Sequence, residues 1–184
     1  MRFPLRVPEE AMRGARERLR SLGIGDYVVV NPGGGWRSKC WPAERYGVLC
    51  DLLWRRHGLR AVINVGPGEA PLAASLTEAA GGAAPVTVDP SLPELAALLA
   101  QARLVVAADT GPLHLAAALG TRVLALFGPT DPARNGPIPS GAVVRNPSNE
   151  AFTHSRGEEY SPTMLSISVE QVLAEAEREM SVNA

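Results

Sequence analysis

The sequence predicts an α/β fold, a Rossmann-like doubly wound parallel sheet of about six strands with helices on both faces. Short apolar runs alternate along the chain with helical patterns that carry one apolar face. The clearest unit spans residues 104–128: an apolar run, the polar turn Asp-Thr-Gly-Pro at 109–112, a short apolar helix and a second apolar run. Uninterrupted apolar runs are typical of strands buried on both faces of a parallel sheet. We therefore expect ligands to bind at the carboxyl ends of these strands.

The other elements follow from apolar spacing and from the positions of proline and glycine. In chain order we expect a helix from Pro8 to Gly23, a strand at 27–30, a helix from Pro42 to Gly58, a strand at 61–65, a helix at 71–80, a strand at 86–88, a helix beginning at Ser91, a strand at 104–108, a helix at 113–119 and strands at 122–127 and 142–145. Residues 128–137 are expected to lack regular structure, and 146–163 to form a mobile surface loop before a C-terminal helix at 167–180. Ser91 with Glu94, and Ser168 with Gln171, match the spacing of a capping box.

Composition and charge restrict the class of protein. A length of 184 residues predicts a single domain over residues 1–184, of which 1–7 resemble a linker. The net charge of −1 gives no support for nucleic-acid binding, and no apolar run reaches the ~20 residues of a transmembrane helix. Cys40 and Cys50 lack metal-type spacing and are expected to be free thiols. Lys39 is the one lysine among 18 basic residues.

A glycine-rich loop follows the first predicted strand and leads to Lys39. Its sequence, Asn-Pro-Gly-Gly-Gly-Trp-Arg-Ser-Lys at 31–39, matches neither the dinucleotide fingerprint nor the Walker lysine motif. Consecutive glycines allow close approach of a ligand to the backbone, and Lys39 is placed to bind a phosphate. The alternative is a flexible loop with an exposed lysine. Trp36 and Trp41 have two interpretations, ligand wall or packing residue, and packing is favoured for Trp41.

Further candidates lie at the ends of the other strands. Thr110 and Gly111 offer a hydroxyl group and N–H donors at a helix start, which favours anions. Asp109 either contacts a ligand or braces the turn, and His114 either donates to a diphosphate or is a satisfied core residue. Glu69 is either a solvated loop residue or a partner for the two hydroxyl groups of a ribose. His57 and His154 are given no role in a site.

Two motifs carry a resemblance to a known family. The run Asp-Thr-Gly-Pro-Leu-His-Leu-Ala-Ala-Ala-Leu-Gly at 109–120, with Leu-Phe-Gly-Pro-Thr-Asp-Pro at 126–132, resembles the family-9 glycosyltransferases, the ADP-heptose:lipopolysaccharide heptosyltransferases. The earlier Asn-Pro-Gly-Gly-Gly-Trp-Arg-Ser-Lys-Cys-Trp-Pro at 31–42 is similar to that family's Pro-Gly-Ala-x-x-x-x-Lys-x-Trp-Pro. The order of elements agrees over nearly the whole chain. Several relatives carry a cysteine-containing segment before the last helix, whereas residues 146–163 have none, which leaves the subgroup open.

The resemblance implies the second, donor-binding half of a two-domain GT-B glycosyltransferase. An acceptor domain of comparable size would precede Met1, and it would hold the general base, so no catalytic residue is assigned here. The resemblance also implies ADP-heptose or a similar ADP-sugar as the donor, a lipid-linked oligosaccharide as the acceptor bound through that domain, and a cytoplasmic protein that is peripheral at the inner membrane. The residues that match the donor site are Gly34, Gly35, Lys39, Thr110 and Gly111 at the diphosphate, Asp109 and His114 near the diphosphate and sugar, Glu69 at the ribose and Pro90 beside the adenine.

The expected reaction is an inverting transfer without a metal or other cofactor. Fixed positive charge and oriented N–H groups would stabilise the leaving nucleoside diphosphate, and the sequence has no acidic cluster of the kind that binds Mg²⁺. Because the acceptor hydroxyl must lose a proton to a base, we expect the chain alone to bind an ADP-sugar without transferring it. Two alternatives share the fold: an NAD-dependent oxidoreductase domain and a non-catalytic nucleotide-binding module.

Overall fold

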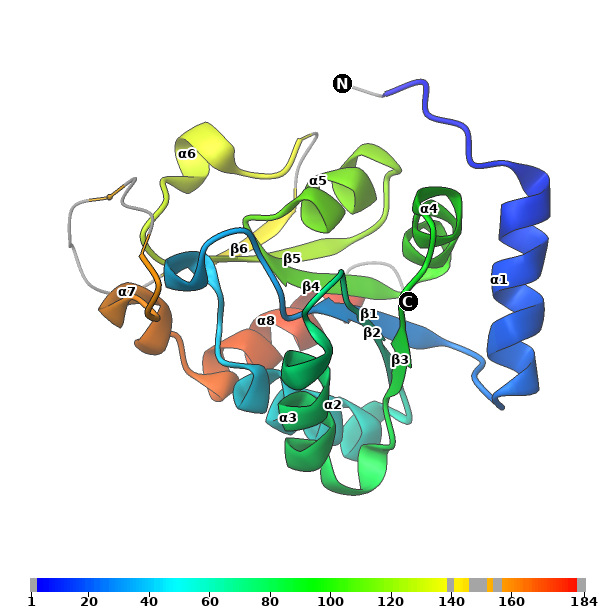
Figure 1. Cartoon of the computed structure of the whole chain (residues 1–184), viewed down its shortest axis with the longest axis horizontal. Helices are drawn as coiled ribbons and strands as arrows, with labels where there is room; N and C mark the ends of the chain where they lie inside the picture. Colours follow the sequence, from blue (N-terminus) through cyan, green and yellow to red (C-terminus); the bar gives the residue numbers. More distant parts are fainter. Residues whose placement is uncertain (1–2, 139–140, 146–151, 154–156, 182–184) are drawn as a thin grey trace.

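Six parallel strands form one sheet in the order β3-β2-β1-β4-β5-β6, which confirms the predicted fold class (Figure 1). The computed structural model describes residues 3–138, 141–145, 152–153 and 157–181. The strands are β1 (Tyr27–Asn31), β2 (Arg60–Asn64), β3 (Val86–Val88), β4 (Leu104–Ala108), β5 (Val123–Phe127) and β6 (Ala142–Arg145). The helices are α1 (Glu9–Ser21), α2 (Ala43–His57), α3 (Ala70–Ala79), α4 (Leu92–Gln101), α5 (Gly111–Ala118), α6 (Pro132–Asn135), α7 (Pro162–Leu165) and α8 (Val169–Ser181), with short 3₁₀ helices η1 (Arg37–Lys39) and η2 (Gly81–Ala83).

The strand order reverses between β1 and β4, the two central strands of the sheet. From β1 the chain continues to β2 and β3 on one side, whereas from β4 it continues to β5 and β6 on the other. The connections after β1 and β4 therefore lead to opposite faces of the sheet and leave a crevice at the strands' carboxyl ends. Ligands of open α/β sheets bind at such a reversal. Asn31 ends β1 and Ala108 ends β4, so the residues that follow them are expected to border a ligand.

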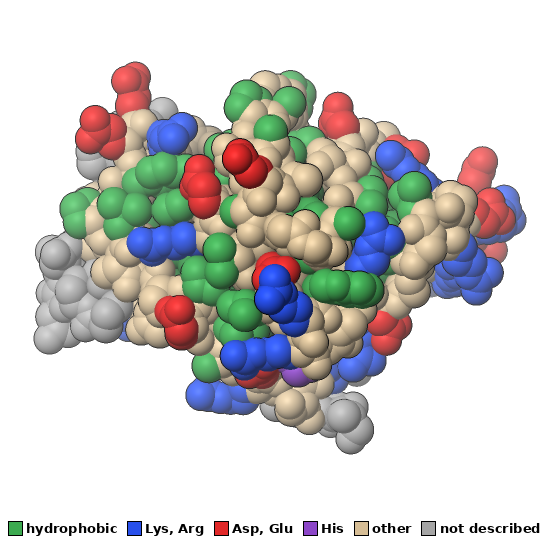
Figure 2. Space-filling model, turned by 90° about the horizontal axis from the view of Figure 1, so that it is seen from below, with side chains coloured by type: hydrophobic (Ala, Val, Ile, Leu, Met, Phe, Trp, Pro, Cys, Tyr) green, Lys and Arg blue, Asp and Glu red, His purple; other side chains and the backbone are tan. Residues whose placement is uncertain are grey.

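Alternating side chains of the strands enter two separate hydrophobic cores. Val28 and Val30 pack with α2, α3 and α8, whereas Val29 packs with α1, α4 and α5. The two helix layers lie on opposite sides of the sheet in Figure 1. Figure 2 shows the α2 and α3 side from outside, where charged side chains of both signs lie scattered between hydrophobic ones. The sheet is thus covered on both faces, as the uninterrupted apolar strands predict.

Predicted helix boundaries hold where capping chemistry determines them. The Ser91 N–H donates to Glu94 Oε2 over 2.8 Å at the start of α4, and Ser168 exchanges the equivalent bonds with Gln171 before α8. Gly120 follows α5 with a φ of 82°, a conformation that favours glycine. The helix expected at 167–180 begins at Val169, because Ser168 is its capping residue.

The structure corrects two expectations for the later loops. Residues 128–137 contain the short helix α6, whose start is capped by the Asp131 carboxylate accepting the Ala133 N–H over 2.8 Å. The loop expected at 146–163 ends earlier, because α7 begins at Pro162 and Thr163 is buried. Within the same stretch, Gly157 exchanges hydrogen bonds of 3.3 Å with Ser38, so this part is tied to the loop after β1. Residues 146–151 and 154–156, including His154, lie outside the described residues.

Trp41 confirms its interpretation as a packing residue. Its side chain is fully buried, its ring meets the Tyr46 ring edge-to-face at 4.9 Å, and its Nε1 donates to the Ile167 carbonyl over 3.0 Å. The neighbouring Arg45 donates to the carbonyls of Leu165 and Ile167. The chain between α7 and α8 is therefore fixed to the start of α2.

Candidate functional site

A cavity of about 650 Å³ lies at the carboxyl ends of β1, β2 and β4. Among the predicted site residues, Gly34, Gly35, Lys39, Glu69, Asp109, Thr110, Gly111 and His114 line it. Its other lining residues are Asn31, Gly33, Asn64, Val65, Gly66, Leu95 and Pro112. Pro90 is not among the lining residues, whereas Leu95 of α4 is. The structure thus gathers into one space residues that are separated by up to 83 positions in the chain.

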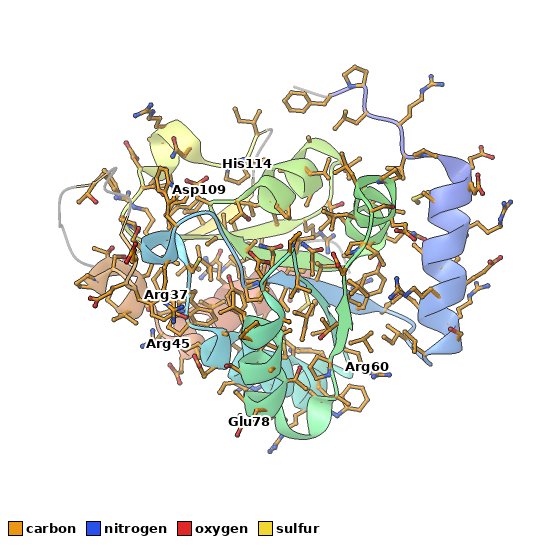
Figure 3. All side chains as sticks on the ribbon, viewed as in Figure 1. Arg37, Arg45, Arg60, Glu78, Asp109 and His114 are labelled. Carbon is orange, nitrogen blue, oxygen red and sulfur yellow. The ribbon has the colours of Figure 1, made fainter. Side chains whose placement is uncertain are left out.

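Asp109 is the centre of the polar contacts in this cavity. Its Oδ2 lies 3.3 Å from the Lys39 ammonium and 3.2 Å from Asn135 Nδ2, which donates to it. Its Oδ1 lies 3.1 Å from His114 Nε2 (Figure 3). Three side chains from three different segments therefore converge on one nearly buried carboxylate.

These contacts keep the Asp109 carboxylate ionised. Burial alone would raise its pKa, but the hydrogen bond from His114, the charge of Lys39 and the hydrogen bond from Asn135 outweigh burial and lower the pKa to about 2. A nearly buried carboxylate is unfavourable unless it is paired and hydrogen-bonded. Asp109 meets both conditions, and its contacts hold Lys39, His114 and Asn135 at the cavity.

Lys39 reaches the cavity from η1 and is held by three groups. Its ammonium donates to the Asp109 backbone carbonyl over 2.9 Å, pairs with the Asp109 carboxylate and lies 4.7 Å from the centre of the Trp36 ring. Only 16% of its side chain is exposed. The alternative of an exposed lysine on a flexible loop is therefore wrong.

The amino end of α5 lines the cavity beside the glycine-rich loop, where a Cβ at Gly34 would lie 3.2 Å from Thr110 Cγ2. Thr110 precedes the helix with an extended backbone, and its hydroxyl donates to the Ala108 carbonyl over 3.2 Å, so it does not cap the helix N–H groups. A side chain at Gly111 would meet open space. The first N–H groups of a helix have no partner within the helix, and here they border the cavity. An anion is a suitable partner for them.

His114 is a cavity residue, which excludes its interpretation as a core histidine. Its side chain is 43% exposed and lines the cavity from the first turn of α5. One ring nitrogen contacts Asp109, and within the described residues the other has no hydrogen-bond partner. The second nitrogen is free to contact a bound ligand.

Sequence reasoning missed several residues that shape this cavity. Asn31 donates from Nδ2 to the Gly33 carbonyl over 3.0 Å, and Asn64 donates to Asn31 Oδ1 over 2.6 Å. Both asparagines are buried at the ends of their strands. For Asn31, a polar residue directly after an apolar run was the available signal, whereas Asn64 stands inside the run expected at 61–65. Asn135 gave no such signal, because its contact with Asp109 depends on the path of α6.

A second cavity of about 440 Å³ shares Asp109, His114 and Asn135 with these contacts. Its wall includes Arg134 and the apolar Ile138. Among the described residues, no group of three or more His, Cys, Asp or Glu side chains is arranged to bind a metal ion. Over the same part of the chain, no helix has the length and hydropathy needed to cross a bilayer.

Comparison with known proteins agrees with this architecture. Lipopolysaccharide heptosyltransferase 3 of Escherichia coli is 35% identical over 130 residues, which cover 67% of this chain and 38% of that protein. Lipopolysaccharide heptosyltransferase 1 of E. coli O18:K1:H7 is 38% identical over 130 residues, or 68% of this chain and 39% of that protein. This chain thus spans about two fifths of the length of these curated relatives.

Solved structures are also similar to this chain over about half of their length. The structure of E. coli heptosyltransferase WaaC with ADP has a TM-score of 0.70 and 30% identity, covering 90% of this chain and 48% of that chain. The family-9 glycosyltransferase of Veillonella parvula has a TM-score of 0.82, covering 96% of this chain and 53% of that one; at 24% identity it supports the fold alone.

The sheet order, the crevice at the strand reversal and these neighbours define a Rossmann-like α/β fold of the kind found in GT-B proteins. The sequence model of glycosyltransferase family 9 (heptosyltransferase) matches residues 7–162. The chain belongs to this family.

Proposed function

We propose that this chain binds the donor nucleotide of a glycosyltransferase that transfers heptose from ADP-heptose to the lipopolysaccharide inner core. The names of the relatives supply the sugar and the acceptor, and two solved relatives contain ADP or an ADP-heptose analogue. The observation that carries the proposal is the position of Lys39 and the amino end of α5 on one cavity, joined through Asp109.

In this proposal the diphosphate lies between the Lys39 ammonium and the first N–H groups of α5. Gly34 and Gly35 let the backbone approach the phosphates, and the free nitrogen of His114 contacts the diphosphate or the sugar. Glu69, which lines the cavity, receives the ribose hydroxyl groups, and Pro90 is retained as a candidate neighbour of the adenine. These contacts come from the segments that follow β1, β2, β3 and β4, so the sheet orients the donor.

The reaction in this proposal is an inverting displacement at the anomeric carbon. The acceptor oxygen attacks that carbon, the bond to the diphosphate oxygen breaks, and the leaving diphosphate gains negative charge. Lys39 and the α5 N–H groups stabilise that charge in place of a metal ion, because they are fixed before the reaction. The proton of the acceptor hydroxyl passes to a general base that we assign to the acceptor domain of the whole protein. Because the acceptor is lipid-linked, the whole protein would act in the cytoplasm at the surface of the inner membrane.

Thermal unfolding of the chain with different nucleotides tests the proposal. A ligand present at 100 times its Kd stabilises a protein by about 2.7 kcal/mol, which corresponds to a Tm increase of roughly 5 to 10 °C for a chain of this size. We expect such an increase with ADP and ADP-heptose, and a smaller one with UDP and NAD at equal concentration. A larger response to NAD would favour an oxidoreductase domain, and no response to any nucleotide would contradict the proposal. Sugar transfer by the chain alone would contradict the assignment of the base to another domain.

A further inference from the structure

The side chain of Glu69 lies against the backbone of Gly33 in the glycine-rich loop. A Cβ atom at Gly33 would lie 1.9 Å from Glu69 Oε1 and 2.3 Å from Oε2. Such distances do not occur between real atoms, so no side chain fits at position 33 while Glu69 keeps its place. The two residues come from the loops after β1 and β2, which both border the main cavity.

Glu69 is also held from its own loop. Its Oε2 accepts the Gly66 N–H over 2.8 Å, and its own N–H donates to the Gly66 carbonyl over 3.1 Å. The carboxylate is therefore fixed between Gly66 on one side and Gly33 on the other. This arrangement reduces the side-chain freedom that Glu69 would otherwise lose on binding a ligand.

Gly33 cannot move away to make room for a side chain. Its carbonyl accepts the Asn31 amide over 3.0 Å, and Asn31 in turn accepts the Asn64 amide over 2.6 Å. Both asparagines are buried and stand at the ends of β1 and β2. A shift of Gly33 would break these hydrogen bonds and leave buried amide groups without their partners.

We infer that Gly33 is a positioning residue, which sets the Glu69 carboxylate for the two hydroxyl groups of the donor's ribose. The inference rests on the proposed function, because it assigns Glu69 to the ribose of a bound nucleotide. On this inference the glycine-rich loop has two roles: it lets the backbone approach the phosphates, and it selects a nucleotide that carries ribose hydroxyl groups. A side chain at position 33 would turn the Glu69 carboxylate away from the ribose. The chain would then no longer bind a ribonucleotide more tightly than a nucleotide without ribose hydroxyl groups.

The steric part is tested without any ligand, by thermal unfolding of G33A, E69A and the double variant. We expect G33A to lower the Tm by several degrees, and the same substitution to cost little in the E69A background, because the obstructing carboxylate is gone. Gly25→Ala is the matched control, since a Cβ there meets nothing within 4 Å. An equal loss from G33A in both backgrounds would overturn the inference.

The functional part compares the Kd of ADP with that of 2′,3′-dideoxy-ADP by calorimetry. We expect the native chain to bind ADP about tenfold more tightly, equivalent to 1.4 kcal/mol. G33A should lose this preference and bind the dideoxy nucleotide as the native chain does. An equal weakening of both nucleotides by G33A would contradict a role at the ribose. If the native chain binds neither, the proposed function fails, while the unfolding cycle still decides whether Gly33 positions Glu69.

Discussion

The Lys39 ammonium lies 3.3 Å from Asp109 Oδ2 and 2.9 Å from the Asp109 backbone carbonyl. This pair joins the loop after β1 to the turn after β4, which are the two strands where the sheet reverses its order. Because both side chains are largely buried, removing either one would leave the charge of the other without its partner. Asp109 therefore fixes the cation at the cavity before a ligand arrives.

Replacing Asp109 by asparagine should change how stability depends on pH. The folded-state pKa of Asp109 is about 2, below its ordinary value of 3.8, so ionisation of this group stabilises the fold above pH 4. That stabilisation is lost as the pH falls from about 4 to 2, and it amounts to about 2 kcal/mol. We expect the difference in unfolding free energy between the native chain and Asp109→Asn to shrink by this amount over the interval.

Urea unfolding of the two proteins at each pH gives this difference directly. The other carboxyl groups titrate in both proteins and cancel in the comparison. Glu17→Gln is a suitable control, because Glu17 is an exposed carboxylate on α1, and no residue of α1 lines the cavity. A difference that stays constant from pH 4 to 2 would show that Lys39, His114 and Asn135 do not hold Asp109 ionised.

Asn135→Asp should destabilise the chain at neutral pH. The substitution keeps the size of the side chain but replaces an N–H donor, 3.2 Å from Asp109 Oδ2, by a second carboxylate. Like charges at that distance repel, and one carboxyl group then binds a proton at a higher pH than usual. We expect a loss of at least about 1 kcal/mol at pH 7, partly recovered as the pH falls towards 4. Asn135→Ala, which only removes the hydrogen bond, should show no such recovery.

Gly47→Ala should destabilise the fold although alanine favours helices. Gly47 lies in α2 where it crosses α3, and a Cβ there would come within 2.3 Å of the Leu76 carbonyl oxygen and 2.6 Å of Ala79 Cβ. Overpacking of this kind costs about 1 to 3 kcal/mol. Gly14→Ala in α1 is the matched control: its Cβ meets nothing within 4 Å, and it should stabilise by up to about 1 kcal/mol. Equal effects at the two sites in chemical unfolding would contradict the close crossing of α2 and α3.

The fold was predictable because each strand is an apolar run and most helix ends carry a local signal. Residues 104–108 are buried without exception in β4, as their composition requires. The missed helix α6 has four residues, between prolines and glycines that indicate a loop when considered alone. Its start depends on the Asp131 cap, which sequence spacing does not distinguish from an ordinary turn.

Site residues were predictable where a reactive or charged side chain comes shortly after a strand in the sequence. They were not predictable where their role depends on tertiary contacts. Asp109 and His114 were candidates because they stand at a strand end and a helix start, and Lys39 because it follows the glycine-rich loop. Asn135 reaches Asp109 only because α6 returns to the cavity, and Gly33 matters only because Glu69 lies against it. The place of Pro90 beside the adenine stays a prediction, because Pro90 does not line the cavity in the structure.

The central claim is that a nucleoside diphosphate binds between Lys39 and the amino end of α5. Its most direct test is a calorimetric titration of ADP into the native chain and into a variant that carries both Lys39→Ala and His114→Ala. Two lost charge-assisted hydrogen bonds of about 1.5 kcal/mol or more each predict a Kd at least 100-fold weaker. Arg55→Ala, which removes an exposed cation paired with Asp51 on α2, should leave the Kd unchanged. An ADP affinity that is the same in the double variant as in the native chain would contradict the account.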